Sequence, residues 1–141
     1  MKKLQALVLS PLDDSCRHIV DEIKNSLKAS GVTPMHIYTQ IKPGEVWVNA
    51  ITDAIQEADI IIADVSKTSK NSFIFWELGF ASALRKPAML LLSTDAAERI
   101  PLGLEGYLMA TYDPKDLTSL QGTISRFIEY QKSRWSGKDA A

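Results

Sequence analysis

The feature that most constrains the fold of this chain is the alternation of short apolar runs with segments of helical periodicity. Five runs have the length of buried β-strands, at residues 4–9, 32–38, 60–63, 88–92 and 106–112. Continuous apolar runs such as 60–63 are typical of strands that are covered on both faces. Apolar residues recur at helical spacing in four further segments, at residues 16–31, 47–58, 72–84 and 117–128.

This alternation predicts an α/β fold with a parallel sheet, because a crossover helix joins one parallel strand to the next. Five such units in 141 residues fit a flavodoxin-like three-layer sandwich, with a five-stranded sheet of order 2-1-3-4-5 and helices on both faces. Pro34 argues for an edge position of the second strand, because proline cannot donate a ladder hydrogen bond. We expect a single domain over residues 1–135 and a flexible tail over residues 136–141.

Composition and charge exclude several classes of protein. The formal net charge of −1 gives no support for a nucleic-acid or membrane partner. Cys16 is the single cysteine, so the chain forms no internal disulfide and a reducing compartment is expected. The opening MKKLQALVL lacks the length and cleavage site of a signal peptide, and no apolar stretch reaches the ~20 residues of a membrane span. We therefore expect a cytoplasmic protein.

The predicted sheet also predicts where a ligand binds. In sheets of this order, ligands bind beyond the carboxyl ends of the strands, between the first and the third strand. This rule selects residues 10–14, residues 64–71 and the start of the third helix. The usual glycine-rich phosphate-binding loops are absent from the sequence. His18 and His36 lie on different elements without a ligand spacing, so we expect neither a metal nor a cofactor.

Glu77 is the only charged residue between Phe73 and Leu84. Helical spacing places it on one face with Phe73, Phe80 and Leu84, and apolar residues on the other face lead us to expect a helix sandwiched on both sides. An uncompensated carboxylate is strongly disfavoured there, and such groups are frequent at functional sites. Glu77 is therefore the main catalytic candidate. The alternative is a structural carboxylate, paired with a buried arginine or with backbone donors.

Other polar residues fall at the same edge of the predicted sheet. Asp64 ends the third strand and is expected to point into the same crevice as Glu77, although a cap or turn role is an equal alternative. Asn71 is either a ligand contact or the cap of the third helix. Asp13 and Asp14 offer an N-cap and an acidic first turn to the first helix.

Five more residues have structural interpretations. Ser10 and Pro11 either line the site or only end the first strand. Gly79 is interpreted as a helix position where a neighbour packs closely, because glycine there costs about 1 kcal/mol relative to alanine. Trp47 and Trp76 are interpreted as core or subunit-interface residues.

A longer pattern joins these residues. The run ADIIIADVSKTSKNSFIFWELGFASALRKPAMLLL resembles the pattern A-D-(three apolar)-A-D-(loop)-N-P-N-V-F-Y-E-L-G-(apolar)-A-x-A-L-x-K-P. That pattern belongs to the nucleoside 2-deoxyribosyltransferase-like proteins, including their Toll/interleukin-receptor-like (TIR-like) branch. The segment LVLSPLDDS resembles the first strand of that branch followed by P-F-x-D. The resemblance extends from Leu4 to about Leu92.

The resemblance implies chemistry at C1′ of a ribosyl group in a nucleoside, a nucleotide or NAD as substrate. In these relatives the glutamate of E-L-G attacks or stabilises the anomeric carbon while the base leaves, and Glu77 has that place here. Asp64 would be the second carboxyl group, acting on the leaving base or on the incoming water. A homo-oligomer is also implied, because such proteins often complete their sites across a subunit boundary. The substrate-binding residues implied are Ser10, Pro11, Asp13, Asp14 and Asn71.

Departures from the pattern leave alternatives open. Phe73 stands where the pattern has its second Asn, and Ser72 stands where it has Pro, so ligand choice differs or activity is absent. One alternative is a non-catalytic nucleotide-binding or TIR-like interaction module. A more distant alternative is a phospho-acceptor receiver domain, in which Asp64 would be phosphorylated while Asp13 and Asp14 hold magnesium. The sequence leaves the substrate, and hydrolysis against transfer, undecided.

Overall fold

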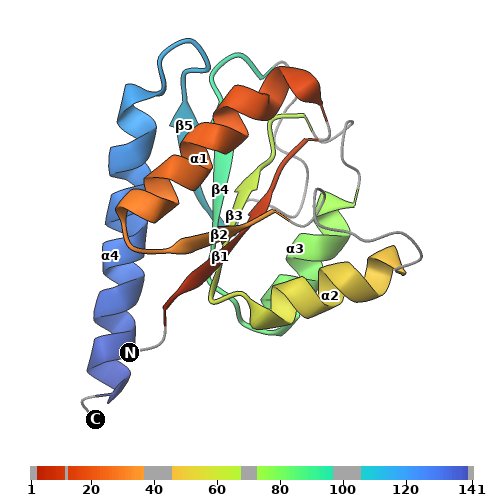
Figure 1. The fold of residues 1–141 in the computed structure, drawn as a ribbon, viewed down its shortest axis with the longest axis vertical. Helices are drawn as coiled ribbons and strands as arrows, with labels where there is room; N and C mark the ends of the chain where they lie inside the picture. Colours follow the sequence, from red (N-terminus) through yellow and green to blue (C-terminus); the bar gives the residue numbers. More distant parts are fainter. Residues whose placement is uncertain (1–2, 12, 37–45, 68–72, 97–105, 140–141) are drawn as a thin grey trace.

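The computed structural model describes residues 3–11, 13–36, 46–67, 73–96 and 106–139. Its sheet has five parallel strands in the order β2-β1-β3-β4-β5. The strands are β1 (Gln5–Leu9), β2 (Thr33–Met35), β3 (Ile60–Asp64), β4 (Ala88–Ser93) and β5 (Leu108–Tyr112). The predicted fold class and strand order are therefore confirmed (Figure 1).

Helices cover both faces of this sheet (Figure 1). They are α1 (Arg17–Ala29), α2 (Trp47–Glu57), α3 (Ile74–Ala83) and α4 (Leu120–Asp139), with the 3-10 helices η1 (Asp14–Cys16) and η4 (Leu117–Ser119). The cap predicted for the first helix lies on the 3-10 turn η1 that leads into α1, because the Asp13 carboxylate accepts a hydrogen bond from the Ser15 backbone N–H at 3.0 Å; the N-cap of α1 itself is Cys16, which makes no such side-chain bond. Gly31 follows α1 with a φ of 77°, a left-handed conformation that favours glycine.

Strand alternation divides the core into two apolar clusters. The even-numbered residues of β1 and the isoleucines at even positions of β3 pack with side chains of α1 and α4. Leu7 and Leu9 of β1 and the odd-numbered residues of β3 pack with side chains of α2 and α3. Because successive side chains of a strand point to opposite faces, the position of a residue in its strand decides which helices it meets.

The second strand lies at an edge of the sheet, as Pro34 predicts. It is shorter than expected, since β2 spans three residues. Val32 is excluded from it because its backbone N–H donates to the Leu27 carbonyl at the end of α1, at 2.9 Å. Residues 37 and 38, predicted to continue this strand, lie outside the described residues.

The expectation that the third helix is sandwiched on both sides is wrong. One side of α3 is buried, but Phe75 and Trp76 on the helix are 39% and 44% exposed. Phe73 and Leu84, expected on the buried stripe, flank the helix and are also exposed. The reason is that α3 belongs to an outer layer of the sandwich, so the sheet covers one of its sides only. The buried residues of α3 are Ile74, Glu77, Leu78 and Ala81.

The last helix is longer than predicted. Its helical backbone continues past Trp135 to Asp139, into the segment expected to be a flexible tail. That segment contains a glycine but no proline, and a glycine lowers helix stability by about 1 kcal/mol without ending the helix. The bounds of the single domain itself remain a prediction.

No helix in the described part of the chain is long and apolar enough to cross a membrane. Within the same ranges, no three His, Cys, Asp or Glu side chains are grouped so that they could hold a metal ion.

Candidate functional site

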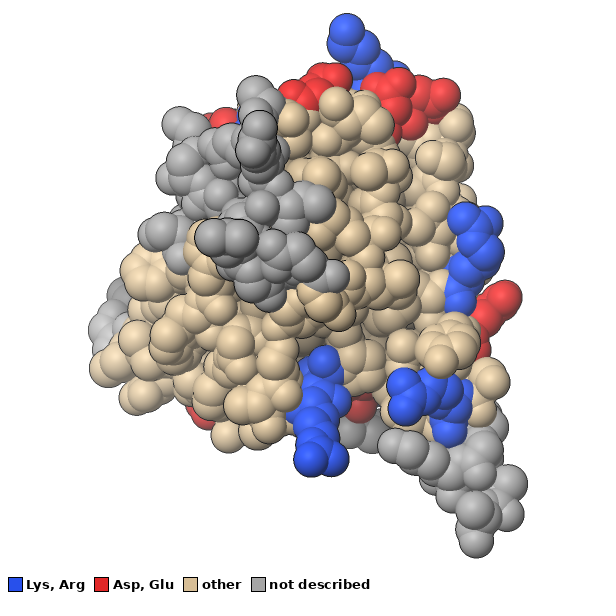
Figure 2. Space-filling view, turned by 180° about the vertical axis from the view of Figure 1, so that it is seen from behind, with Lys and Arg blue, Asp and Glu red and all other residues tan. Residues whose placement is uncertain are grey.

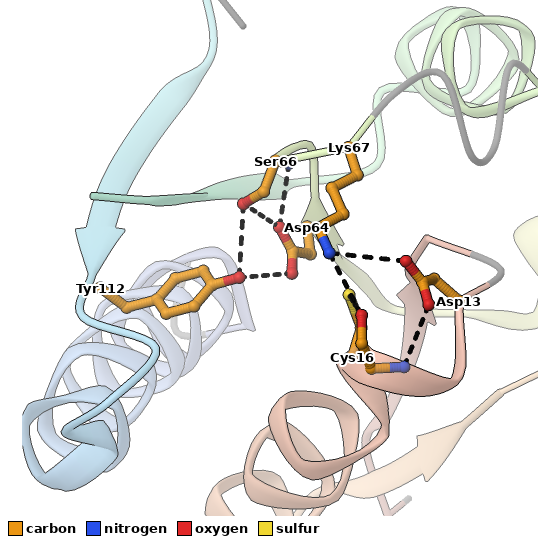
Figure 3. A network of polar contacts seen from close by, with 7 residues as sticks. Asp13, Cys16, Asp64, Ser66, Lys67 and Tyr112 are labelled. Atoms are coloured by element: carbon orange, nitrogen blue, oxygen red, sulfur yellow. Dashed lines mark hydrogen bonds and ion pairs between the residues drawn. The ribbon is translucent and has the colours of Figure 1, made fainter. Parts of the chain in front are cut away.

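A buried hydrogen-bond network around Asp64 joins the carboxyl ends of β3, β4 and β5 (Figure 3). Asp64 is 2% exposed. Its Oδ1 accepts hydrogen bonds from the backbone N–H and the hydroxyl of Ser66, at 3.0 and 2.5 Å, and its Oδ2 accepts one from the Tyr112 hydroxyl at 2.7 Å. The Ser66 Oγ accepts a hydrogen bond from the Ser93 backbone N–H at 2.7 Å. The turn after β3 is thereby fixed to the ends of β4 and β5.

Three donors replace the water that Asp64 loses on burial, which makes a buried carboxylate tolerable. Burial, and next the negative charge of Asp64, raise the pKa of Tyr112, so its hydroxyl stays protonated and keeps donating. These contacts match the turn role that was one of the two alternatives for Asp64.

Lys67 connects this turn to the loop that follows β1 (Figure 3). Its Nζ lies 3.4 Å from Asp13 Oδ2 and 3.2 Å from Ser15 Oγ. A hydrogen bond from the Ser15 backbone is the main reason that the pKa of Asp13 is lowered. Asp14 is exposed beside this group. A partly exposed cation with hydroxyl and carboxylate neighbours therefore lies at the switch point between β1 and β3, where sheets of this order bind ligands.

Ser10 and Pro11 are buried rather than open to a ligand. The Ser10 Oγ lies 2.9 Å from His36 Nε2, which ties the end of β1 to the end of β2. Burial, and next the positive charge of Lys24, lower the pKa of His36 to about 4. The imidazole is therefore neutral near neutral pH. This contact gives Ser10 a structural place at the edge of the candidate site.

Glu77 is fully buried, with 0% of its surface exposed. It lies in the first turn of α3, where the helix dipole favours a negative charge. The neighbouring buried residues Ile74, Leu78 and Ala81 are apolar and belong to the cluster beneath α2 and α3. The predicted burial of this carboxyl group is confirmed, and its desolvation has to be offset by its surroundings.

The structure does not bring Asp64 and Glu77 together in one crevice, contrary to expectation. Asp64 has the same parity in β3 as Ile60 and Ile62, which pack with α1 and α4, and its partner Tyr112 belongs to that same cluster. Glu77 lies on α3, on the other face of the sheet. The reason is the two-residue period of a strand, which directs the side chain at position 64 away from α3.

Asn71 lies outside the described residues, so its predicted ligand contact stays a prediction. Sequence reasoning missed the roles of Tyr112 and Ser66. Tyr112 pairs in register with Ser93 at the end of the sheet, and the register of β4 and β5 is what brings its hydroxyl to Asp64. A serine two residues after a strand-ending aspartate is the signal of an Asx turn, which identifies Ser66 in retrospect.

Comparison with models of protein families matches residues 13–126 to the TIR domain. This match confirms the predicted family resemblance. No curated protein sequence matches the chain.

Solved structures share the fold at low sequence identity. A 2-deoxyribosyltransferase from Bacillus psychrosaccharolyticus has a TM-score of 0.65 and 22% identity, over 83% of this chain and 90% of that one. The CMP N-glycosidase BcmB from Clostridium botulinum has a TM-score of 0.64 and 17% identity, over 87% of this chain and 98% of that one. The TIR domains of the activated Roq1 resistosome have a TM-score of 0.54 and 12% identity, over 64% of this chain and 58% of that one.

Proposed function

This chain belongs to the TIR domain family, and from that premise we propose that it is an enzyme acting at the N-glycosidic bond of a nucleoside, a nucleotide or NAD. In this proposal Glu77 faces C1′ of the ribosyl group, as a nucleophile or as the counter-charge of an oxocarbenium-like centre. A small molecule of this kind would reach the site from the carboxyl ends of the strands.

The complete burial of Glu77 is the observation that carries the proposal. A carboxyl group among apolar side chains lowers the stability of a helix unless its surroundings compensate, so an apolar residue would serve packing alone better. A carboxylate shielded from bulk water is, by contrast, what stabilisation of a developing positive charge requires.

In the proposed reaction, such a carboxylate has to stabilise the positive charge that develops on the sugar. As the C1′–N bond breaks, the base leaves with the bonding electron pair and positive charge develops on the sugar. The carboxylate either stabilises this charge or forms an ester with C1′, and water or a second acceptor then takes the sugar. Which acceptor reaches C1′ decides between hydrolysis and transfer.

Two of the structurally similar proteins support this class of substrate. One is named a 2-deoxyribosyltransferase and the other a CMP N-glycosidase. In the proposal Asp13 and Asp14 contact the ligand, and Asn71 is retained as a contact. Ser10 and Pro11 shape the loop from their buried positions, and Asp64 holds the turn after β3 rather than acting on the base.

The test is to incubate the purified protein with NAD, a set of deoxynucleosides and nucleoside monophosphates, and to follow free base by chromatography. We expect base release from at least one substrate and its loss in Glu77→Gln, which keeps the shape but removes the carboxylate. Glu129→Gln is the matched control, because Glu129 is exposed on α4. Release from none of the substrates, at concentrations that support an oligomer, would contradict the proposal.

A second candidate function is a non-catalytic TIR-like interaction module. Exposed apolar side chains favour it, because contiguous patches of this kind are typical of protein-binding surfaces. Phe73, Phe75 and Trp76 are between 39% and 51% exposed. Figure 2 shows a broad surface between the α3 side and the α4 side whose Lys, Arg, Asp and Glu residues lie mainly at its margins. Sedimentation velocity over a concentration series, with Trp76→Lys as the variant, tests whether copies of the chain meet through the exposed aromatic side chains of α3.

The receiver-domain alternative is not carried forward. Its phospho-acceptor would be Asp64, which is 2% exposed and already accepts three hydrogen bonds. The matched family is the TIR domain.

A further inference from the structure

The Lys67 ammonium and the Asp13 carboxylate form a pair of hydrogen-bonding groups at the switch point between β1 and β3 (Figure 3). Lys67 Nζ lies 3.4 Å from Asp13 Oδ2, and the two side chains are 46% and 26% exposed. Both can therefore contact a molecule that arrives from the solvent, unlike Asp64, which is 2% exposed. The pair joins the turn after β3 to the loop after β1, where sheets of this order bind their ligands.

Both members of this pair can form further hydrogen bonds. Asp13 accepts one from the Ser15 backbone N–H and one from Lys67, and a carboxylate has lone pairs for more. Among the residues that the structure describes, the Lys67 ammonium contacts Asp13 Oδ2 and Ser15 Oγ, and an ammonium group can donate once more. The pair therefore offers a ligand an acceptor directly beside a donor.

The charges around this pair favour a neutral partner over an anion. Lys67 is balanced by Asp13, and beside them the Asp14 carboxylate lies 3.5 Å from the Arg17 guanidinium. Asp13 stays ionised, because the hydrogen bond from the Ser15 backbone lowers its pKa. A phosphate at Lys67 would therefore meet the Asp13 carboxylate at close range and be repelled by it. A hydroxyl group avoids this repulsion, since it can accept from the ammonium or donate to the carboxylate.

We propose that Lys67 and Asp13 bind the 2′ and 3′ hydroxyl groups of a ribose, so that the site selects ribosyl over 2′-deoxyribosyl substrates and gains no affinity from a 5′-phosphate. This inference rests on the function proposed above and names the sugar of its substrate. One hydroxyl accepts a hydrogen bond from the Lys67 ammonium, and its neighbour donates to the Asp13 carboxylate. A carboxylate that binds a ribose 2′ hydroxyl is a general solution in nucleotide sites. Lys67 is thereby a specificity-determining residue.

The test measures binding rather than turnover, so that its outcome does not depend on catalysis by Glu77. Adenosine, guanosine, cytidine and uridine, their 2′-deoxy counterparts and their 5′-monophosphates are titrated into the full chain, with the backbone resonances of Ser15 and Lys67 as NMR reporters. Where base is released during the titration, Glu77→Gln replaces the unmodified protein. We expect a ribonucleoside to bind about tenfold more tightly than its 2′-deoxy counterpart, the size of one hydrogen bond to a charged group. Its monophosphate should bind no more tightly than the ribonucleoside.

Variants assign the preference for ribose to the two side chains. Lys67→Met and Asp13→Asn should each abolish it, and asparagine can still accept the hydrogen bond from the Ser15 backbone that begins the helical turn. Asp13→Asn should also make the monophosphate bind more tightly than the ribonucleoside, because the charge of Lys67 is then uncompensated. Loss of a merely structural contact would not produce this gain. Lys28→Gln and Asp53→Asn, which change exposed residues of α1 and α2, are the matched controls and should preserve both preferences.

Three results would overturn this inference while leaving the proposed function intact. The first is a 2′-deoxyribonucleoside that binds as tightly as its ribonucleoside. The second is a preference for ribose that persists in Lys67→Met. The third is a monophosphate that binds the unmodified protein more tightly than the ribonucleoside does, which would make Lys67 a phosphate contact. Binding of none of the nucleosides or monophosphates would overturn both, whereas a preference for ribose without base release from any substrate would contradict the proposed function alone.

Discussion

At the scale of single residues, the molecule contains two buried carboxyl groups with different surroundings. Asp64 is surrounded by hydrogen-bond donors that belong to a turn and to a neighbouring strand. Glu77 lies in the first turn of a helix among apolar neighbours. The donors around Asp64 support a structural role for it, whereas the complete burial of Glu77 at the start of a helix is the basis of the chemical role proposed for that residue.

Tyr112→Phe tests the structural role of Asp64. The substitution removes the hydrogen bond to Asp64 Oδ2 and leaves a buried carboxylate with one donor fewer. We expect the free energy of unfolding to fall by about 1–3 kcal/mol, measured by urea denaturation. Tyr130→Phe is the matched control, because Tyr130 is 59% exposed. Equal stability of the two variants would show that the bond to Asp64 does not stabilise the fold.

His36 predicts how stability depends on pH. Its pKa is about 4 in the folded protein and 6.5 in an ordinary environment, so the unfolded chain binds more protons between these values. The contribution of His36 to stability is therefore complete above about pH 6.5 and is lost as the pH falls towards about 4. Urea denaturation of His36→Gln across this range should show a flatter pH dependence than that of the unmodified protein. His18→Gln, which changes an exposed histidine, is the control. If both variants flatten the pH dependence of the free energy of unfolding equally, His36 is not the group responsible.

At the scale of elements, α3 combines a buried side that carries Glu77 with a side rich in exposed aromatic residues. Two aromatic contacts lie on this side of the helix. The ring centroids of Trp47 and Phe73 are 4.6 Å apart, and Trp76 stacks on Phe80 with ring centroids 5.9 Å apart. Trp47 is partly buried and packs against the cluster beneath α2 and α3, in agreement with the core interpretation. Trp76 is 44% exposed, so for Trp76 the interface interpretation is the one to test.

Gly79 corrects another interpretation of α3. A β-carbon added at Gly79 would have nothing within 4 Å, so no neighbour packs closely there. Gly79→Ala should therefore raise the free energy of unfolding by about 0.5–1 kcal/mol, because alanine loses less backbone entropy in a helix. Gly31→Ala should lower it, since φ at Gly31 is 77°. A loss of stability in Gly79→Ala would mean that the exposed side of α3 is covered in solution.

At the scale of the whole molecule, the sheet and its strand order could be predicted from the sequence. Buried parallel strands have continuous apolar sequences, and the helical segments between them indicate the flavodoxin-like order. The burial of Glu77 follows equally from helical spacing. The side on which Asp64 lies was missed because position 64 ends its strand, where a polar residue gives no sign of which helices its side chain meets. The hydrogen bond from the Tyr112 hydroxyl to Asp64 was missed because it depends on the register of β4 and β5. This register cannot be predicted from the residue types of the two strands.

The whole-molecule account rests on Glu77 as the group that acts at C1′. The most direct measurement is the single-turnover rate of base release from the best substrate, compared among the unmodified protein, Glu77→Gln and Glu129→Gln. The account predicts a loss of at least about a hundredfold in Glu77→Gln, the scale of removing one preorganised catalytic group. It predicts no loss in Glu129→Gln and unchanged circular dichroism in both. A Glu77→Gln protein that releases base at the unmodified rate would contradict the central claim.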